Sequence, residues 1–240
     1  MTVTTPLLIL FDLDGTLVDS VPDLAASVTR TLEKMGRDPH PESSIRNWVG
    51  NGVDRLIKRA LTHSMDAEPD ESEFELALSL FMDDYRENVC VDSKLCASVA
   101  ETLPLLISHG HALGCVTNKA SDFTIPLLEK LDIHQYFSVV VSGNDVAEKK
   151  PSPLSIEYAA KKMKMEMTDV IMVGDSINDI QAAKNAGVTC VGVPDGYNHG
   201  VPIADANPDY LVETIADIPH TIAQMQSEND QNGFANIASG

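Results

Sequence analysis

The chain is poor in positive charge. Its 17 Lys and Arg residues stand against 36 Asp and Glu residues, which gives a formal net charge of −19 at pH 7. A charge of this sign repels nucleic acid and anionic membrane surfaces at long range, so we expect neither as a partner. A small anionic substrate would need a local positive site, which a bound metal ion and a specific Lys would supply.

Cysteines and long apolar runs are also scarce. The four cysteines form no C-x-x-C pair and no spacing with histidine that indicates zinc. No apolar run approaches the roughly 20 residues that a membrane span requires, and the first residues lack the basic stretch and cleavage site of a signal peptide. We therefore expect free thiols, no membrane contact and a location in the reducing cytoplasm.

The composition is otherwise that of a globular protein, with 43% apolar and 22% charged residues. The 240 residues suffice for a core of about 150 residues with a smaller inserted domain. The last segment is rich in Ser, Asn, Asp, Gln and Gly and has few residues able to anchor it. We expect residues 227–240 to form a loosely held tail without chemistry.

Apolar periodicity divides the rest of the chain into two parts. The run 6–11 is continuously apolar, as in a strand buried on both faces of a parallel sheet. From residue 20 to about 90 the apolar positions recur with helical period, and this block is too long for an ordinary crossover helix. We therefore predict an inserted helical domain over 20–91. Ser20 is a suitable N-cap for its first helix, and Asp23 follows at capping-box spacing.

Helices and strands alternate after residue 98, which predicts an α/β fold with a doubly wound, Rossmann-like parallel sheet. Residues 1–19 and 92–226 would form this core. We predict helices at 98–109, 121–131, 153–164 and 177–186, and strands at 111–116, 138–142, 169–173 and 188–193.

Two carboxylates end the first apolar run. Asp12 and Asp14 lie on the same side of an extended chain, so both can reach one cation or one phosphate, and Gly15 then turns the chain away. An Asp-rich turn would explain Asp14 and Gly15 but leaves Asp12 unexplained. A calcium-binding loop needs Gly at its sixth position, whereas here it is the fourth residue.

Polar residues also follow the next two predicted strands. Thr117 and Asn118 come after 111–116 and could donate to a phosphate, although capping the next helix is an equally good role. Lys150 precedes a proline, which restricts its backbone and makes it a candidate fixed cation. The alternative for Lys150 is a solvated loop residue.

Asp175 and Asp179 follow the strand at 169–173 and, four residues apart, can face the same way if a helix begins between them. Each could instead stabilise the dipole of that helix. Because the carboxyl ends of parallel strands share one edge of the sheet, the four strand ends together indicate a site for metal-assisted phosphoryl transfer.

These residues, in this order, resemble the haloacid dehalogenase-like (HAD) superfamily over about residues 6–225. The resemblance implies the HAD core fold, with residues 20–91 as an all-helical cap domain. The matching motifs are Asp12-Leu13-Asp14-Gly15-Thr16, then Thr117, then Lys150, and finally the acidic pair Asp175 and Asp179.

The resemblance also implies roles for these residues. Asp12 would be the nucleophile that forms an aspartyl phosphate, and Asp14 would protonate the leaving alkoxide and then activate water. Mg²⁺ would be held by Asp12, by the main-chain carbonyl of Asp14 and by Asp175.

Thr117 and Lys150 would bind phosphate oxygens, with Asn118 nearby. Asp179 would support Lys150 or the surroundings of the metal rather than bind it directly. The presence of Asp14 argues against carbon–halogen cleavage, because that reaction needs no acid to protonate a leaving alkoxide.

Within the superfamily, three segments resemble the bacterial phosphoglycolate phosphatases. They imply a Mg²⁺-dependent phosphatase for a small phosphorylated metabolite, 2-phosphoglycolate first, acting as a monomer or homodimer. A phosphosugar mutase similar to beta-phosphoglucomutase, a phosphatase for another small metabolite, and a phosphate-binding module without turnover remain the alternatives. The segments are Trp48–Gly52, Gly143–Val146 continuing through Lys149-Lys150-Pro151, and Asp195–Gly200.

Overall fold

The computed structural model describes residues 5–194 and 196–237, except the side chains of 229–237. Its helices are α1 (Val21–Lys34), α2 (Glu42–Trp48), α3 (Val53–Thr62), α4 (Glu71–Glu87), α5 (Val99–Ser108), α6 (Ser121–Lys130), α7 (Leu154–Met163), α8 (Ile177–Ala186) and α9 (Ile218–Ile237). Its strands are β1 (Leu8–Phe11), β2 (Val18–Asp19), β3 (Lys94–Leu95), β4 (Ala112–Val116), β5 (Val139–Val141), β6 (Val170–Gly174), β7 (Thr189–Gly192) and β8 (Tyr210–Leu211).

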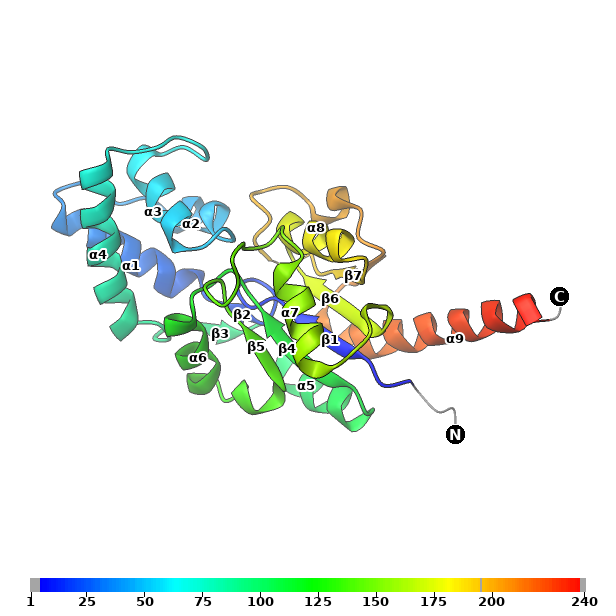
Figure 1. The fold of residues 1–240 in the computed structure, drawn as a ribbon. Coiled ribbons are helices and arrows are strands. Elements are labelled where there is room, and N and C mark those ends of the chain that lie inside the picture. Colours follow the sequence, from blue (N-terminus) through cyan, green and yellow to red (C-terminus); the bar gives the residue numbers. More distant parts are fainter. Residues whose placement is uncertain (1–4, 195, 238–240) are drawn as a thin grey trace.

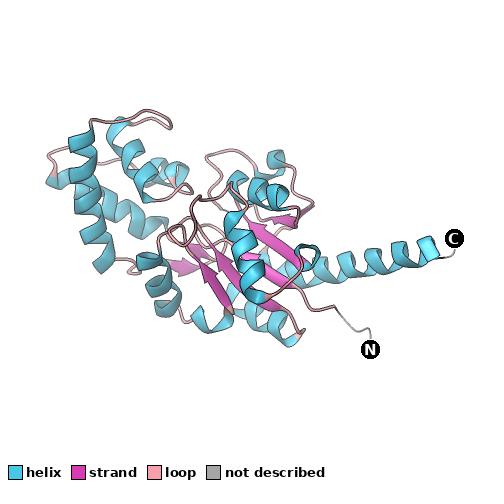
Figure 2. Ribbon diagram, in the orientation of Figure 1, coloured by secondary structure: helices cyan, strands magenta, loops and turns pink. Residues whose placement is uncertain are grey.

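Six of the strands form one parallel sheet at the centre of the molecule, with helices around it (Figure 2). The strand order is β5-β4-β1-β6-β7-β8, so the first strand of the chain pairs with β4 on one side and β6 on the other. The predicted doubly wound α/β fold is confirmed. Its predicted helices and strands match the observed ones to within one or two residues at each end.

The continuous apolar run of β1 reflects its position between two layers of helices. Leu8 and Leu10 belong to a buried cluster that includes residues of α7 and α8. Ile9 and Phe11 point the other way, into a larger cluster with residues of α5 and α6. Because successive side chains of a strand face opposite sides, every residue of β1 is buried.

Helices α1–α4 form a group beside the sheet, on the side away from α9 (Figure 1). Residues 20–91, all of which the structure describes, contain these helices and their connecting loops and no strand. The short strands β2 and β3 pair antiparallel, with Val18 opposite Leu95 and Asp19 opposite Lys94. This pair holds together the points where the chain leaves the sheet region and returns to it.

The capping box predicted for α1 is wrong. Ser20 precedes the helix, but its side chain makes no capping bond, and its hydroxyl donates to Asp14 Oδ1 instead. Asp23 accepts hydrogen bonds from the main-chain N–H groups of residues 91–93 and from the Ser93 hydroxyl. The returning segment passes beside the first turn of α1, and a contact between residues 70 apart in the chain cannot be read from local spacing.

Residues 227–237, expected to be a loosely held tail, continue α9, which extends away from the sheet in Figure 1. The remaining tail residues, 238–240, lie outside the described residues. In the described part of the chain, no helix combines the length and apolar character needed to cross a bilayer.

Replacing Asp23 by Ala should lower the free energy of unfolding by about 3 kcal/mol, because the buried N–H and hydroxyl of Ser93 and the partly buried N–H groups of Val91 and Asp92 lose their acceptor. Burial alone would raise the pKa of Asp23, but the Ser93 hydroxyl and the three main-chain donors outweigh it and hold the pKa below its usual value. Such a carboxylate stabilises the fold above its unfolded pKa and loses this effect as the pH falls.

Urea denaturation should therefore show the largest D23A effect near neutral pH and a shrinking effect below about pH 4. D23N keeps one acceptor oxygen and serves as the matched control, with a smaller loss of stability. Equal stability of D23A and the unaltered protein at pH 7 would contradict the assignment.

Candidate active site

The site lies where four neighbouring strands end. Their order β5-β4-β1-β6 brings Lys150, Thr117, Asp12 and Asp175 to one edge of the sheet, and all four are buried. Asp12 continues the pairing of β1, since its N–H donates to the carbonyl of Val173 at 2.9 Å. The parallel ladder therefore sets the position of the first acid.

Lys150 links two of the acids. Its Nζ lies 2.8 Å from Asp12 Oδ1 and 2.6 Å from Asp179 Oδ1, and it also donates to the carbonyl of Val116 at 2.7 Å. The other oxygen of Asp179 accepts from the N–H and hydroxyl of Ser176 at the start of α8. Asp179 thus contacts Lys150 directly and is itself held by the helix start.

Asp14 has partners that the sequence analysis did not assign. Lys119 Nζ lies 3.0 and 3.2 Å from its two carboxylate oxygens, and the Ser20 hydroxyl donates to Oδ1 at 2.5 Å. Lys119 is buried, and its Nζ lies 5.0 Å from the centre of the Tyr85 ring of α4. In the sequence, the feature that could have indicated Lys119 was its position directly after Thr117 and Asn118. Ser20 was interpreted only as a helix cap.

Asp175 is held from both sides. Its Oδ1 accepts from the Thr16 hydroxyl and its Oδ2 from the main-chain N–H of Tyr197, both at 2.5 Å. A Cβ atom at Gly15, where φ is +94°, would lie 2.4 Å from Asp175 Oδ2, and one at Gly196 would lie 2.1 Å from it. Glycine is therefore required at both positions for the backbone to approach this carboxylate.

Asn118 connects the strand ends to the helical group. Its amide nitrogen donates to the carbonyls of Gly50 and Lys150 at 3.0 Å each, and its oxygen accepts from the N–H of Lys150 at 2.8 Å. These bonds use both amide hydrogens, so the side chain positions the Lys150 backbone. Its predicted contact with phosphate stays a prediction.

Three of the acids form a cluster suited to a metal ion. Oxygen atoms of Asp12, Asp175 and Asp179 lie within 4.8 Å of one another. Burial, followed by repulsion from Asp179, raises the pKa of Asp12 to about 7 despite the opposing effect of Lys150. Burial, followed by repulsion from Asp179 and from Asp12, raises the pKa of Asp175 well above its usual value.

Burial and mutual repulsion thus favour the protonated forms of Asp12 and Asp175, and a bound cation would favour their ionised forms. Its all-oxygen donor set fits a hard divalent cation such as Mg²⁺. Asp12 and Asp175 belong to the predicted metal set, whereas Asp14 enters that set through its main-chain carbonyl. The ligand set itself remains a prediction.

A cavity of about 30 Å³ lies between the strand ends and the helical group. Its sheet side carries the polar residues Asp12, Asp14, Thr117, Asn118 and Lys119. Its helical side carries apolar side chains and two glycines, namely Leu24, Val49, Gly50, Gly52, Val53 and Leu56.

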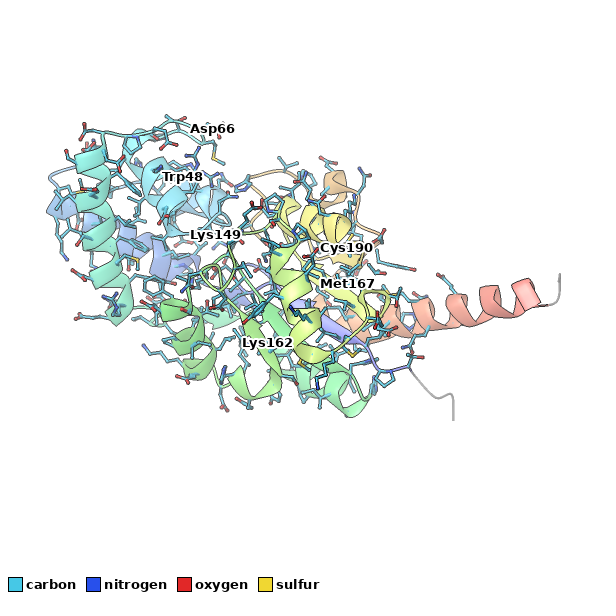
Figure 3. All side chains as sticks on the ribbon, viewed as in Figure 1. Trp48, Asp66, Lys149, Lys162, Met167 and Cys190 are labelled. Carbon is cyan, nitrogen blue, oxygen red and sulfur yellow. The ribbon has the colours of Figure 1, made fainter. Side chains whose placement is uncertain are left out.

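Lys149 lies at the same junction (Figure 3). A Cβ atom at Gly52 would lie 2.7 Å from its Nζ. Lys149 is not among the residues that line the described cavity.

Comparison with known proteins agrees with this geometry. The family model for haloacid dehalogenase-like hydrolases matches residues 9–193. Phosphoglycolate phosphatases from Nitrosococcus oceani and Vibrio parahaemolyticus are 44% and 42% identical, and the alignments cover 91% and 90% of this chain and 97% and 96% of those proteins. A solved structure described as a predicted phosphoglycolate phosphatase from Haemophilus somnus 129PT has a TM-score of 0.85 at 38% identity, covering 92% of this chain and 99% of that one.

The chain therefore belongs to the family of haloacid dehalogenase-like hydrolases. The predicted resemblance is confirmed. Within the family the chain is a phosphatase, the class that these relatives share.

The affinity of the acidic cluster for Mg²⁺ should fall as the pH falls below about 7, because protons and the cation compete for the oxygens of Asp12 and Asp175. Titration calorimetry between pH 5.5 and 8, in two buffers of different ionisation enthalpy, measures both the affinity and the protons released. D122N changes an exposed carboxylate of α6 outside the cluster and should keep the same pH dependence. An affinity independent of pH over this range would contradict the prediction.

Proposed function

We propose that the protein is a Mg²⁺-dependent phosphatase that hydrolyses 2-phosphoglycolate to glycolate and phosphate through an aspartyl phosphate. The observation that carries the proposal is the different pairing of two carboxylates at the end of β1. Asp12 pairs with Lys150 beside the acidic cluster, whereas Asp14 pairs with Lys119 and Ser20 and faces the cavity. The two acids are thereby suited to two tasks.

Asp12 is the proposed nucleophile. The ladder bond to Val173 and the ion pair with Lys150 hold its carboxylate at the floor of the cavity. An attack by one carboxylate oxygen on phosphorus forms the aspartyl phosphate and releases the alkoxide. Covalent catalysis of this kind divides one difficult displacement into two easier ones.

Asp14 is the proposed acid and base. In the first step its carboxylic acid gives a proton to the leaving alkoxide, and in the second its carboxylate takes a proton from the attacking water. The Ser20 hydroxyl and the Lys119 ammonium hold the carboxyl group of Asp14 in one orientation. Thr117 and Lys150 would contact the phosphate oxygens.

Mg²⁺ would be held by Asp12, Asp175 and the main-chain carbonyl of Asp14. When bound, it would offset the negative charge that a phosphate dianion meets in this acidic protein. Asp179 would keep Lys150 in place, as its short contact with that ammonium indicates.

Helices α1–α4 are the proposed cap domain. The cavity has room for about two water molecules, so these helices must move relative to the sheet before a phosphate ester can enter. The apolar cap side, with Leu24, Val49, Val53 and Leu56, offers no side-chain partner for sugar hydroxyls. This wall favours a small leaving group over the sugar substrate of a mutase.

The choice of 2-phosphoglycolate rests on the relatives, which are named phosphoglycolate phosphatases and align with this chain over nearly their whole length. A cytoplasmic location and a monomeric or homodimeric state stay predictions.

Replacing Asp12 by Asn should reduce kcat for 2-phosphoglycolate by at least about 1,000-fold, because an amide cannot form the phosphoenzyme. Release of inorganic phosphate in the presence of Mg²⁺ measures the effect. Circular dichroism and urea denaturation establish that the variant is folded. Near-normal turnover by the folded variant would disprove the assignment of the nucleophile.

Replacing Asp14 by Asn should separate the two steps. With 4-nitrophenyl phosphate, the leaving phenolate needs no proton, so D14N should release about one equivalent of 4-nitrophenolate in a burst and then turn over slowly. With 2-phosphoglycolate, whose alkoxide needs the proton, both steps should be slow. Stopped-flow absorbance measures the burst, and equal losses on both substrates without a burst would exclude Asp14 as the proton donor.

A further inference from the structure

We propose that Lys119 recognises a carboxylate on the leaving group and makes the site selective for phosphate esters of small hydroxy acids. This inference rests on the proposed function and deepens it, because it assigns the substrate class to one side chain. Sequence motifs did not single out Lys119 for any role. Its contact with Asp14 is a feature of the fold.

Lys119 is the one cationic side chain among the described residues that line the cavity. It follows β4, two residues after Thr117, and only about 5% of its surface is exposed. The opposing cap side offers apolar side chains and the main chain of two glycines. An anionic leaving group therefore has a single charged side chain in the described cavity that attracts it.

The position of this cation relative to Asp14 matches the chemistry of a hydroxy-acid ester. Lys119 Nζ contacts both oxygens of Asp14, the proposed donor to the ester oxygen. In 2-phosphoglycolate the carboxylate carbon is attached to the same carbon as that ester oxygen. A carboxylate so close to the ester oxygen would lie beside the Lys119 ammonium, which is paired with Asp14, the proposed proton donor.

The Lys119 ammonium can bind Asp14 and a substrate carboxylate at the same time. It has three N–H donors, so it can bridge Asp14 and a substrate carboxylate with charge-assisted hydrogen bonds. The Tyr85 ring lies against it and supports the positive charge through its π face. A leaving group with a hydroxyl in place of the carboxylate gains no comparable attraction.

The competing role for Lys119 is to hold Asp14 and nothing more. The ratio of kcat/KM for 2-phosphoglycolate to kcat/KM for 2-hydroxyethyl phosphate separates the two roles. The second substrate carries a hydroxymethyl group in place of the carboxylate and needs the same protonation of its alkoxide. Loss of Asp14 positioning lowers both values equally, whereas loss of carboxylate recognition lowers the ratio.

K119Q still donates a hydrogen bond to Asp14 but carries no charge, and K119M removes both. We expect each variant to lower the ratio by about 30-fold or more, mainly through the KM for 2-phosphoglycolate. K119R should recover part of the ratio. Lys149→Met, which removes a nearby ammonium that does not line the described cavity, is the matched control and should leave the ratio unchanged.

An equal loss on both substrates in K119Q and K119M, with a preserved preference in the unaltered enzyme, would overturn the role of Lys119 and leave the proposed function intact. A fall of the ratio in the Lys149 variant alone would also overturn it. An unaltered enzyme that shows no preference for 2-phosphoglycolate would overturn both the inference and the proposed substrate.

Discussion

The charge balance at the carboxyl ends of β5, β4, β1 and β6 is the constraint on which the rest of the site depends. Asp12, Asp175 and Asp179 are buried within reach of one another, and Lys150 forms ion pairs with Asp12 and Asp179. Burial favours the protonated form of a carboxyl group, and neighbouring carboxylates favour it further. A divalent cation at this cluster would favour the ionised carboxylates, and the all-oxygen donor set is suited to one.

The same edge of the sheet also supports a second, separate pair. Asp14 is only two residues from Asp12, yet its side-chain contacts are with Lys119 and Ser20 rather than with the acidic cluster. Two identical functional groups thereby receive different surroundings, and different surroundings are how carboxylates acquire different roles in one site. Helix α4 contributes to this second pair through Tyr85, so Asp14, the proposed proton donor, lies where the sheet and helices α1–α4 meet.

Much of the architecture was predictable because it depends on local patterns. The apolar run before Asp12 indicated a strand with both faces covered, and the alternation after residue 98 indicated the parallel sheet. The short pair β2 and β3 was not predictable, since two-residue strands carry no periodicity. The contacts of Ser20 and Asp23 were mispredicted for a related reason. Each satisfied a local capping pattern, but tertiary partners at Asp14 and at residues 91–93 bind them instead.

By itself, the sequence determined which chemistry was available. The order and identity of Asp12, Asp14, Thr117, Lys150 and Asp175 followed from strand-end positions, because parallel strands bring their carboxyl ends to one edge. Only the tertiary structure decided how these groups pair. Lys119 follows β4 by three residues and Lys150 follows β5 by nine, and neither local sequence indicates which acid its ammonium meets. The fold brings Lys119 to Asp14, and Lys150 to Asp12 and Asp179. Local sequence patterns do not encode which side chains meet in space, so only the tertiary structure decided this pairing.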